Sequence, residues 1–138
     1  MLHIRDSDQK LEAWRDGVET RMYVSSVTGA RQLTVFEQWC APGRGAPLHI
    51  HAVEEVLRVL EGQAHITVDR EDAVVEAGES VIIPAGVPHS FVNKADMPLH
   101  TLAILAAPIF EVSYLESGRD NRRWGPALHS GDNSTELH

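Results

Sequence analysis

The sequence lacks the features of several large classes of protein. Its 138 residues contain one cysteine, Cys40, which cannot form an intramolecular disulfide, so we expect a fold that does not depend on an oxidising compartment. The longest apolar stretch, residues 102–110, is interrupted by Pro108, whereas a membrane helix needs about 18–20 apolar residues. Residues 1–12 mix charges and lack the apolar core of a signal peptide. We therefore expect a soluble, cytoplasmic protein with no membrane partner.

Basic residues are also few. The chain has 12 Lys and Arg against 20 Asp and Glu, for a formal net charge of −8. A protein that binds the phosphate backbone needs a clustered basic surface, so the composition argues against a nucleic-acid partner. Histidine, in contrast, is abundant, with eight residues. The positions of these histidines carry most of the functional information.

Short apolar segments separated by glycine and proline predict an all-β fold. Period-two alternation is clearest at Ala64, Ile66 and Val68, because a strand sends successive side chains to opposite faces. Short strands that recur about every 8–12 residues, with glycine or proline between them, are typical of a β-sandwich or β-barrel. The strands are expected at residues 33–39, 56–60, 64–68, 81–83, 99–105 and 110–114.

The two ends of the chain differ from this central part. We divide the chain into an N-terminal extension (1–30), a β domain (31–115) and a polar C-terminal tail (116–138) that is expected to be partly disordered. Leu11 and Trp14, three residues apart, indicate a short helix at residues 8–14. Trp124 is expected to hold the first half of the tail against the domain.

A set of potential metal ligands lies in the middle of the chain. His49 and His51 are two residues apart, so on an extended strand they point to one face, and Glu55 follows four residues later. Two imidazoles and a carboxylate form a partial ligand set, although such a pair on a strand is commonly plain solvated surface.

The spacing around these residues is more specific. Gly43 is followed by His49, His51, Glu55 and Gly62 in the pattern G(X)5HXH(X)3,4E(X)6G. After an interval, a second pattern, G(X)5PXG(X)2H(X)3N, is matched by the residues Gly78, Pro84, Gly86, His89 and Asn93. These are the two motifs of the cupin family, and every defining position is present. The chain therefore resembles a small single-domain cupin.

This resemblance implies a fold and a metal site. The fold would be a double-stranded jelly-roll β-barrel, and one divalent metal would be bound by His49, His51, Glu55 and His89. Three imidazoles and one carboxylate suit transition metals better than Ca²⁺ or Mg²⁺, with Fe²⁺ favoured and Mn²⁺, Zn²⁺, Ni²⁺ or Co²⁺ as alternatives. An octahedral metal would keep two positions open, whereas a tetrahedral zinc site would be closed and structural.

Other candidate residues follow from strand parity. Leu57 and Val59 share the parity of Glu55, and Phe91 that of His89, so these three are candidate pocket residues. Gln63 and His65 lie on the polar face of their strand, which faces either the cavity, where His65 would be a catalytic acid or base, or solvent. His100 is expected in the core or at an interface. The arginines of the tail either attract an acidic substrate at the barrel mouth or are simply solvated; they are Arg119, Arg122 and Arg123.

Three functions are compatible with these features. The first is an Fe(II)-type dioxygenase acting on a small chelating molecule, in which Glu55 can also act as a base. The second is a non-redox isomerase, lyase, decarboxylase or cyclase. The third is a metal-dependent barrel that binds a small molecule without catalysis. The resemblance also implies a homodimer that exchanges an N-terminal strand, for which residues 22–27 and 33–39 are candidates.

Overall fold

Period-two burial runs through the central strands, as the sequence predicts. In β3 (Thr34–Cys40) and β10 (Leu99–Leu105) every second residue is buried, because one face of each strand packs against the core. A computed structural model describes residues 1–126 of the chain, and all statements on structure refer to this part. Its regular structure is almost entirely β.

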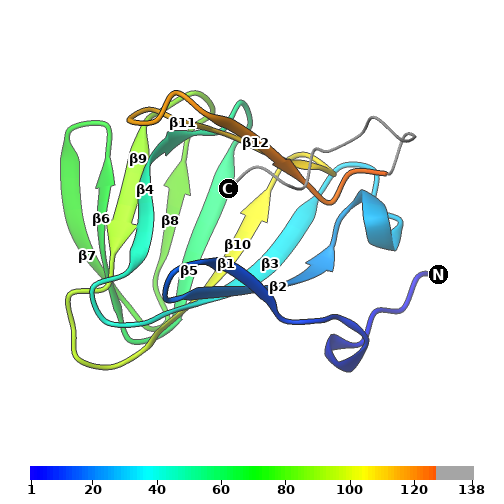
Figure 1. Ribbon diagram of the computed structural model, residues 1–138, viewed down its shortest axis with the longest axis horizontal. Helices are drawn as coiled ribbons and strands as arrows, with labels where there is room; N and C mark the ends of the chain where they lie inside the picture. Colours follow the sequence, from blue (N-terminus) through cyan, green and yellow to red (C-terminus); the bar gives the residue numbers. More distant parts are fainter. Residues whose placement is uncertain (127–138) are drawn as a thin grey trace.

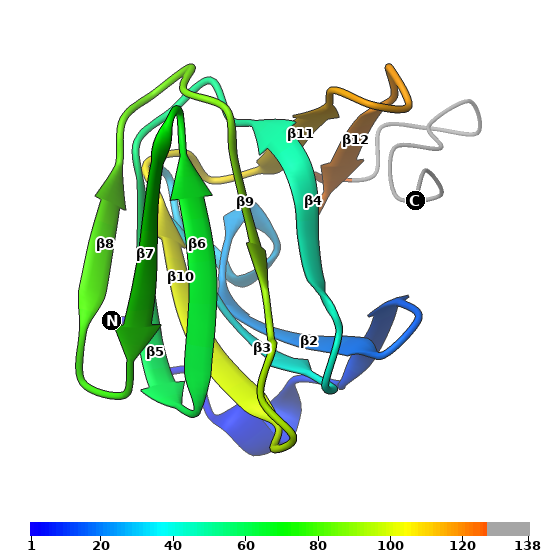
Figure 2. The same cartoon turned by 90° about the vertical axis from the view of Figure 1, so that its left-hand side faces the viewer.

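Twelve strands form two six-stranded antiparallel sheets that lie face to face (Figures 1 and 2). Sheet A has, in spatial order, β1 (Glu12–Arg15), β2 (Val18–Val24), β3, β10, β5 (Glu55–Glu61) and β8 (Ser80–Ile83). Sheet B has β12 (Asp120–Arg123), β11 (Phe110–Tyr114), β4 (Gly45–Ile50), β9 (His89–Val92), β6 (Gln63–Val68) and β7 (Glu71–Glu76). Figure 2 shows β6, β9 and β4 of sheet B in front of β10 and β3 of sheet A.

The all-β jelly-roll class expected from the sequence is confirmed. The two sheets remain separate layers within residues 1–126 and do not close into a continuous barrel. The only helices in this part are two short 3-10 turns, η1 (Asp6–Asp8) and η2 (Ser26–Thr28). No helix of the described residues has the length and apolar character needed to cross a membrane.

The helix expected at residues 8–14 is wrong. This segment instead enters strand β1, which pairs with β2. The reason lies in tertiary packing, since Trp14 is buried among Phe36, Phe110 and Trp124, with ring centroids 5.2 Å to 6.0 Å apart. An aromatic side chain that fills the space between two sheets outweighs a weak local helix preference.

The same aromatic cluster fastens the segment after residue 116. Residues 120–123, which the sequence assigns to the tail, form β12 and pair with β11. Trp124 is buried and its indole nitrogen donates to Glu12 Oε2 at 3.1 Å. Residues 127–138, the remainder of the expected disordered tail, lie outside the described residues.

Candidate metal centre

Four polar side chains meet in the interior between the two sheets. His49 lies near the end of β4, His51 follows in the turn, Glu55 begins β5, and His89 begins β9. One ligand atom from each lies within 4.8 Å of all the others, and all four residues are buried. We call these four residues the ligand cluster. The turn after β4 carries the chain from sheet B to sheet A, so the cluster joins both sheets.

Backbone carbonyls orient the three imidazoles. The Nδ1 atoms of His49, His51 and His89 lie 2.6 Å, 2.8 Å and 2.9 Å from the carbonyl oxygens of Pro47, Glu111 and Val87. A carbonyl can only accept, so each Nδ1 carries the proton and donates. The Nε2 atom of each neutral ring is then an acceptor, which is the form that binds a metal.

Burial keeps the rings of His49 and His51 in this neutral form. Desolvation, followed by the neighbouring imidazoles of His89 and His51, lowers the pKa of His49 to about 2. Desolvation also lowers the pKa of His51, against the opposing effect of Glu55. These two rings are therefore unprotonated near neutral pH.

The contacts inside the cluster require a cation. Glu55 Oε1 lies 3.2 Å from His89 Nε2 and 3.4 Å from His51 Nε2. With Nδ1 protonated, each of these contacts places one lone pair against another, which is repulsive unless a proton or a metal ion lies between them. Because burial disfavours a proton on His51, a metal ion satisfies the group best.

The donor set and its dimensions suit a transition metal. Metal–nitrogen and metal–oxygen bonds of about 2.0–2.2 Å place donor atoms roughly 3–4.4 Å apart on one ion. The contacts of 3.2 Å and 3.4 Å fall in this range, and a spread within 4.8 Å needs only small side-chain rotations. Three imidazoles and one carboxylate fit Fe²⁺, Mn²⁺, Co²⁺, Ni²⁺ or Zn²⁺.

The cavity beside the cluster is narrow. It has a volume of about 30 Å³, which leaves room for an ion and one or two waters. Of the candidate pocket residues, Leu57 and Phe91 line this cavity. Val59 is fully buried in the core and does not line it.

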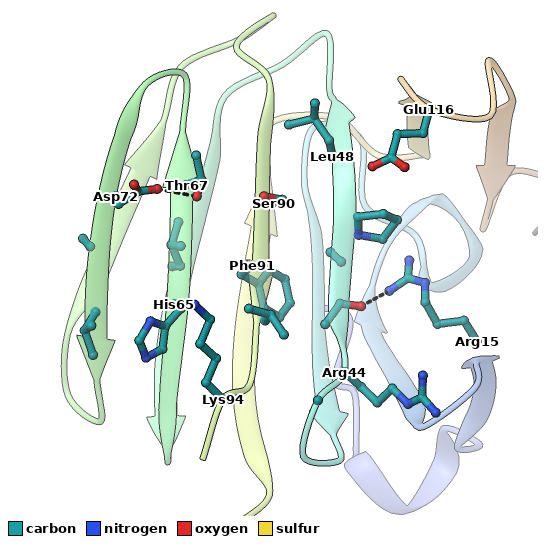
Figure 3. Close-up of a pocket in the computed structure, with 18 of the residues that line it drawn as sticks. Arg15, Arg44, Leu48, His65, Thr67, Asp72, Ser90, Phe91, Lys94 and Glu116 are labelled. Carbon is teal, nitrogen blue, oxygen red and sulfur yellow. Dashed lines mark hydrogen bonds between the residues drawn. The ribbon is translucent and has the colours of Figure 1, made fainter.

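The structure does not bring His65 or Gln63 to the cluster. Ala64 and Ile66 point into the core, so the alternation of β6 turns Gln63 and His65 to the outer face of sheet B. There His65 lines an open groove of about 980 Å³, and Figure 3 shows it on β6 with Lys94 nearby. The sheet separates His65 from the ligand cluster. The structure therefore contradicts the expectation that His65 acts as an acid or base at the metal.

His100 also lies outside the cavity. It faces outward from β10, its ring stacks on Trp39 with centroids 4.6 Å apart, and its Nε2 lies 3.2 Å from Glu37 Oε2. Of the three arginines in the tail, Arg122 lies 3.6 Å from Glu111 and Arg123 lies 3.7 Å from Glu12.

Eight further residues line the cavity that were not among the candidates from the sequence, and four of them carry a polar group: Trp14, Arg15, Gln38 and Tyr114. Gln38 is buried and its Nε2 donates to the Thr20 hydroxyl at 3.0 Å. Of these four residues, only Tyr114 could have been predicted from the sequence to face the interior, since it has the same parity as the inward-facing Phe110 and Val112. Trp14 and Arg15 come from a segment that carries no motif.

Comparison with known proteins agrees with this geometry. Residues 37–105, half of the chain, match the family described as Cupin domain. Gentisate 1,2-dioxygenase from Ralstonia sp. is 32% identical over 81 residues, which cover 58% of this chain and 22% of that protein. The HTH-type transcriptional regulator PuuR from Escherichia coli (strain K12) is 32% identical over 91 residues, covering 65% of this chain and 49% of the regulator. The chain thus spans half or less of these two relatives.

A solved structure extends the likeness to most of the fold. The polyketide cyclase RemF from Streptomyces resistomycificus superposes with a TM-score of 0.67 at 26% identity, covering 76% of this chain and 78% of RemF. The family match contains the whole ligand cluster. The chain belongs to the cupin family.

Proposed function

We propose that this cupin is a metal-dependent enzyme acting on a small organic molecule, and that it is an Fe(II)-type dioxygenase with a chelating substrate. One observation carries the proposal: three buried imidazole acceptors and one buried carboxylate converge within 4.8 Å. Four protein ligands on a six-coordinate ion would leave two positions for a substrate. The similarity to a gentisate 1,2-dioxygenase supports oxygen chemistry.

The residues of the chain have distinct tasks in this proposal. The carbonyls behind His49, His51 and His89 hold the three Nε2 atoms toward one point. Glu55 supplies the fourth ligand and, as the sole carboxylate of the cluster, is the group that can take a proton from the substrate. Leu57 and Phe91 keep bulk water away from the site. When bound, iron supplies Lewis acidity and redox chemistry with dioxygen.

Two alternatives have observations in their favour. The similarity to the polyketide cyclase RemF favours non-redox chemistry with zinc, nickel or manganese, in the class of isomerases, lyases, decarboxylases and cyclases. The similarity to the regulator PuuR favours a barrel that binds a small molecule without turnover. Both keep the same ligand cluster and differ in the metal and in the fate of the ligand.

Metal analysis and oxygen consumption separate these functions. The protein is purified without added metal, its metal content is measured, and iron-loaded protein is tested with 1,2-diphenols and 1,3-dicarbonyl compounds in an oxygen electrode. Bound iron with substrate-dependent oxygen uptake supports the dioxygenase. Bound zinc or nickel, with turnover that is the same in anaerobic buffer, rejects it in favour of non-redox chemistry. Ligand binding without turnover points to the binding barrel.

We further propose a homodimer. The outer face of sheet A carries half-buried Trp39 and exposed Ile82, which a second copy would cover. In the described chain, β2 pairs with β1 and β3 of the same chain. Light scattering after gel filtration measures the mass, and a single species at 15.3 kDa would reject the dimer.

A further inference from the structure

The space beside the ligand cluster is too small for a substrate. Beside this cavity of about 30 Å³ lies a second hollow of about 300 Å³, which we call the mouth pocket. Pockets for small molecules have volumes of roughly 300–1,000 Å³, so the mouth pocket is the space in which most of a substrate fits. Its walls include Trp14, Arg15, Pro47, Leu48, Tyr114 and Arg119. Three of these, Trp14, Arg15 and Tyr114, also line the cavity at the cluster.

Arg15 occupies the boundary between these spaces. It lines the cavity, the mouth pocket and the outer groove, and no other residue lines all three. Its Nη1 donates to the Gly45 carbonyl at 2.8 Å and its Nη2 donates to the Tyr114 hydroxyl at 3.1 Å. Figure 3 shows the guanidinium beside β4, with the bond to Gly45 drawn as a dashed line. These two bonds fix the group in place and use only part of its five N–H donors.

The positive charge of Arg15 is not neutralised by a direct ion pair. Within residues 1–126, Arg15 forms no ion pair with a carboxylate, whereas Arg44, Arg122 and Arg123 each do. Two carboxylates also line the mouth pocket: Asp120 accepts from the Ser113 hydroxyl at 2.7 Å, and Glu116 shares the pocket with Arg15 but forms no ion pair with it. A half-buried, fixed and unpaired guanidinium is an anion receptor, and its fork matches a carboxylate.

Tyr114 connects this receptor to the metal ligands. Its ring centre lies 6.0 Å from the ring centre of His49 and 6.0 Å from Arg15 Cζ. A molecule lying along the Tyr114 ring can therefore reach both the ligand cluster and the guanidinium. The Tyr114 hydroxyl accepts from Arg15, so its own proton remains available for donation to a bound anion.

We propose that Arg15, assisted by the Tyr114 hydroxyl, binds the carboxylate of the substrate, and that the substrate is a small organic acid whose chelating oxygens point to the ligand cluster. This inference rests on the proposed function and adds the substrate class. Arg15 is a binding and specificity residue, since it determines which chelating molecules are held.

The test compares two chelating probes that differ only in a carboxylate. Catechol and 3,4-dihydroxybenzoate are titrated into cobalt-loaded protein by calorimetry and by the visible spectrum of Co²⁺. Because bonds between charged groups are strong, wild type should bind 3,4-dihydroxybenzoate about tenfold or more tighter than catechol. Arg15→Gln should abolish this preference, because it should weaken the binding of 3,4-dihydroxybenzoate more than that of catechol. Tyr114→Phe should reduce the preference only in part.

Arg44→Gln is the matched control. Arg44 lines the outer groove, is paired with Asp16 at 2.8 Å, and does not line the mouth pocket, so its loss removes the same charge and should keep the preference. Arg15→Lys keeps the charge without the fork and serves if Arg15→Gln does not fold. Equal binding of both probes by wild type overturns the inference. A preference that survives in Arg15→Gln also overturns it, as does an undiminished preference in Arg15→Lys if Arg15→Gln does not fold.

Cobalt uptake distinguishes this inference from the proposed function. If the protein binds cobalt but shows no preference for 3,4-dihydroxybenzoate over catechol, the metal centre is supported and the proposed substrate class is wrong. If it binds no cobalt, the proposed function is wrong. Arg15 is then tested as an anion receptor in metal-free protein, by comparing the binding of benzoate with that of benzyl alcohol. Benzoate binding that depends on Arg15 then supports the receptor, and equal binding of the two rejects it.

Discussion

Glu55 Oε1 lies 3.2 Å from His89 Nε2, although the two residues begin strands of opposite sheets. This contact joins β5 to β9 across the interior and depends on a cation between two acceptors. Replacement of His89 by Ala removes one ligand and leaves the buried carboxylate with fewer partners. Since loss of mere supporting partners costs about 10–100-fold in metal affinity, we expect His89→Ala to weaken binding by about 100-fold or more.

Metal content by plasma mass spectrometry and cobalt titration measure this effect. His65→Ala is the matched control, because His65 lies on the outer face of sheet B and should leave occupancy unchanged. Full occupancy in His89→Ala would refute the ligand assignment. Equal losses in both variants would indicate a general effect on folding.

The metal-free protein should lose stability as the pH falls below about 6.5. The pKa of His49 is 6.5 for a free side chain and about 2 in the fold, and that of His51 is also lowered, in both cases chiefly by burial. In the window between these values the unfolded chain binds more protons, so the free energy of unfolding rises with pH. Each such histidine contributes a slope of up to about 1.4 kcal/mol per pH unit.

Urea unfolding of chelator-treated protein between pH 5 and pH 7.5 tests this dependence. The midpoint should move to lower urea as the pH decreases, and His49→Asn should flatten the curve because it removes one titrating group. An unchanged midpoint across this range would contradict the assigned neutral rings.

The sequence predicts the ligand cluster but not its surroundings. The spacing of His49, His51, Glu55 and His89 is local information within two motifs, so the four ligands could be named without coordinates. Arg15 could not be predicted from the sequence as a cavity residue. It reaches the cavity only because β1 pairs with β2 and because Trp14 is buried by residues up to 110 positions away in the chain. Likewise, β7 is exposed at every position but Val75, so it shows no alternation to detect.

Parity has a similar limit. It correctly places Gln63 and His65 on one face, but it does not say which face of a two-layer fold is interior. The burial of Ala64 and Ile66 identifies the interior face, but this burial is known only when the positions of both sheets are known. His49 and Glu55 also have the same parity, but they lie on different sheets, because the chain crosses from sheet B to sheet A in the turn that begins at His51.

Trp124 should contribute strongly to stability. It is buried and packs against Trp14, Phe36 and Phe110. Truncation of a buried aromatic costs about 3–5 kcal/mol, so Trp124→Ala should lower the free energy of unfolding by that amount. Ile82→Ala is the control, since Ile82 is 67% exposed and its loss should change stability by less than about 0.5 kcal/mol. Urea unfolding measures both, and similar values would contradict a role for Trp124 in the core.

Cys40 should be unreactive in the native protein. Its side chain is buried in β3, and this burial raises the pKa of the thiol to about 11, so little thiolate forms at neutral pH. A disulfide reagent such as DTNB should react about 100-fold or more slowly with native protein than with protein unfolded in urea. Comparable rates in the two states would show that Cys40 is accessible.

Gly45 is the glycine on which the spacing of β4 and β9 depends, although it is not a motif position. A Cβ atom there would lie 2.0 Å from the Phe91 carbonyl oxygen and 2.8 Å from Val92 Cα, both on the backbone of β9. Backbone cannot give way as a side chain can, so Gly45→Ala should force apart the strands that carry His49 and His89. We expect weaker cobalt binding, together with a loss of stability of about 1–3 kcal/mol.

The motif glycine Gly43 provides the contrast. It has a φ of +81° but nothing within 4 Å of its Cβ position, so Gly43→Ala should cost only the backbone strain of about 1–2 kcal/mol and keep cobalt affinity. Urea midpoints and cobalt titrations of both variants separate strain from strand separation. If Gly45→Ala binds cobalt as tightly as Gly43→Ala does, the approach of β4 to β9 does not control the geometry of the metal ligands.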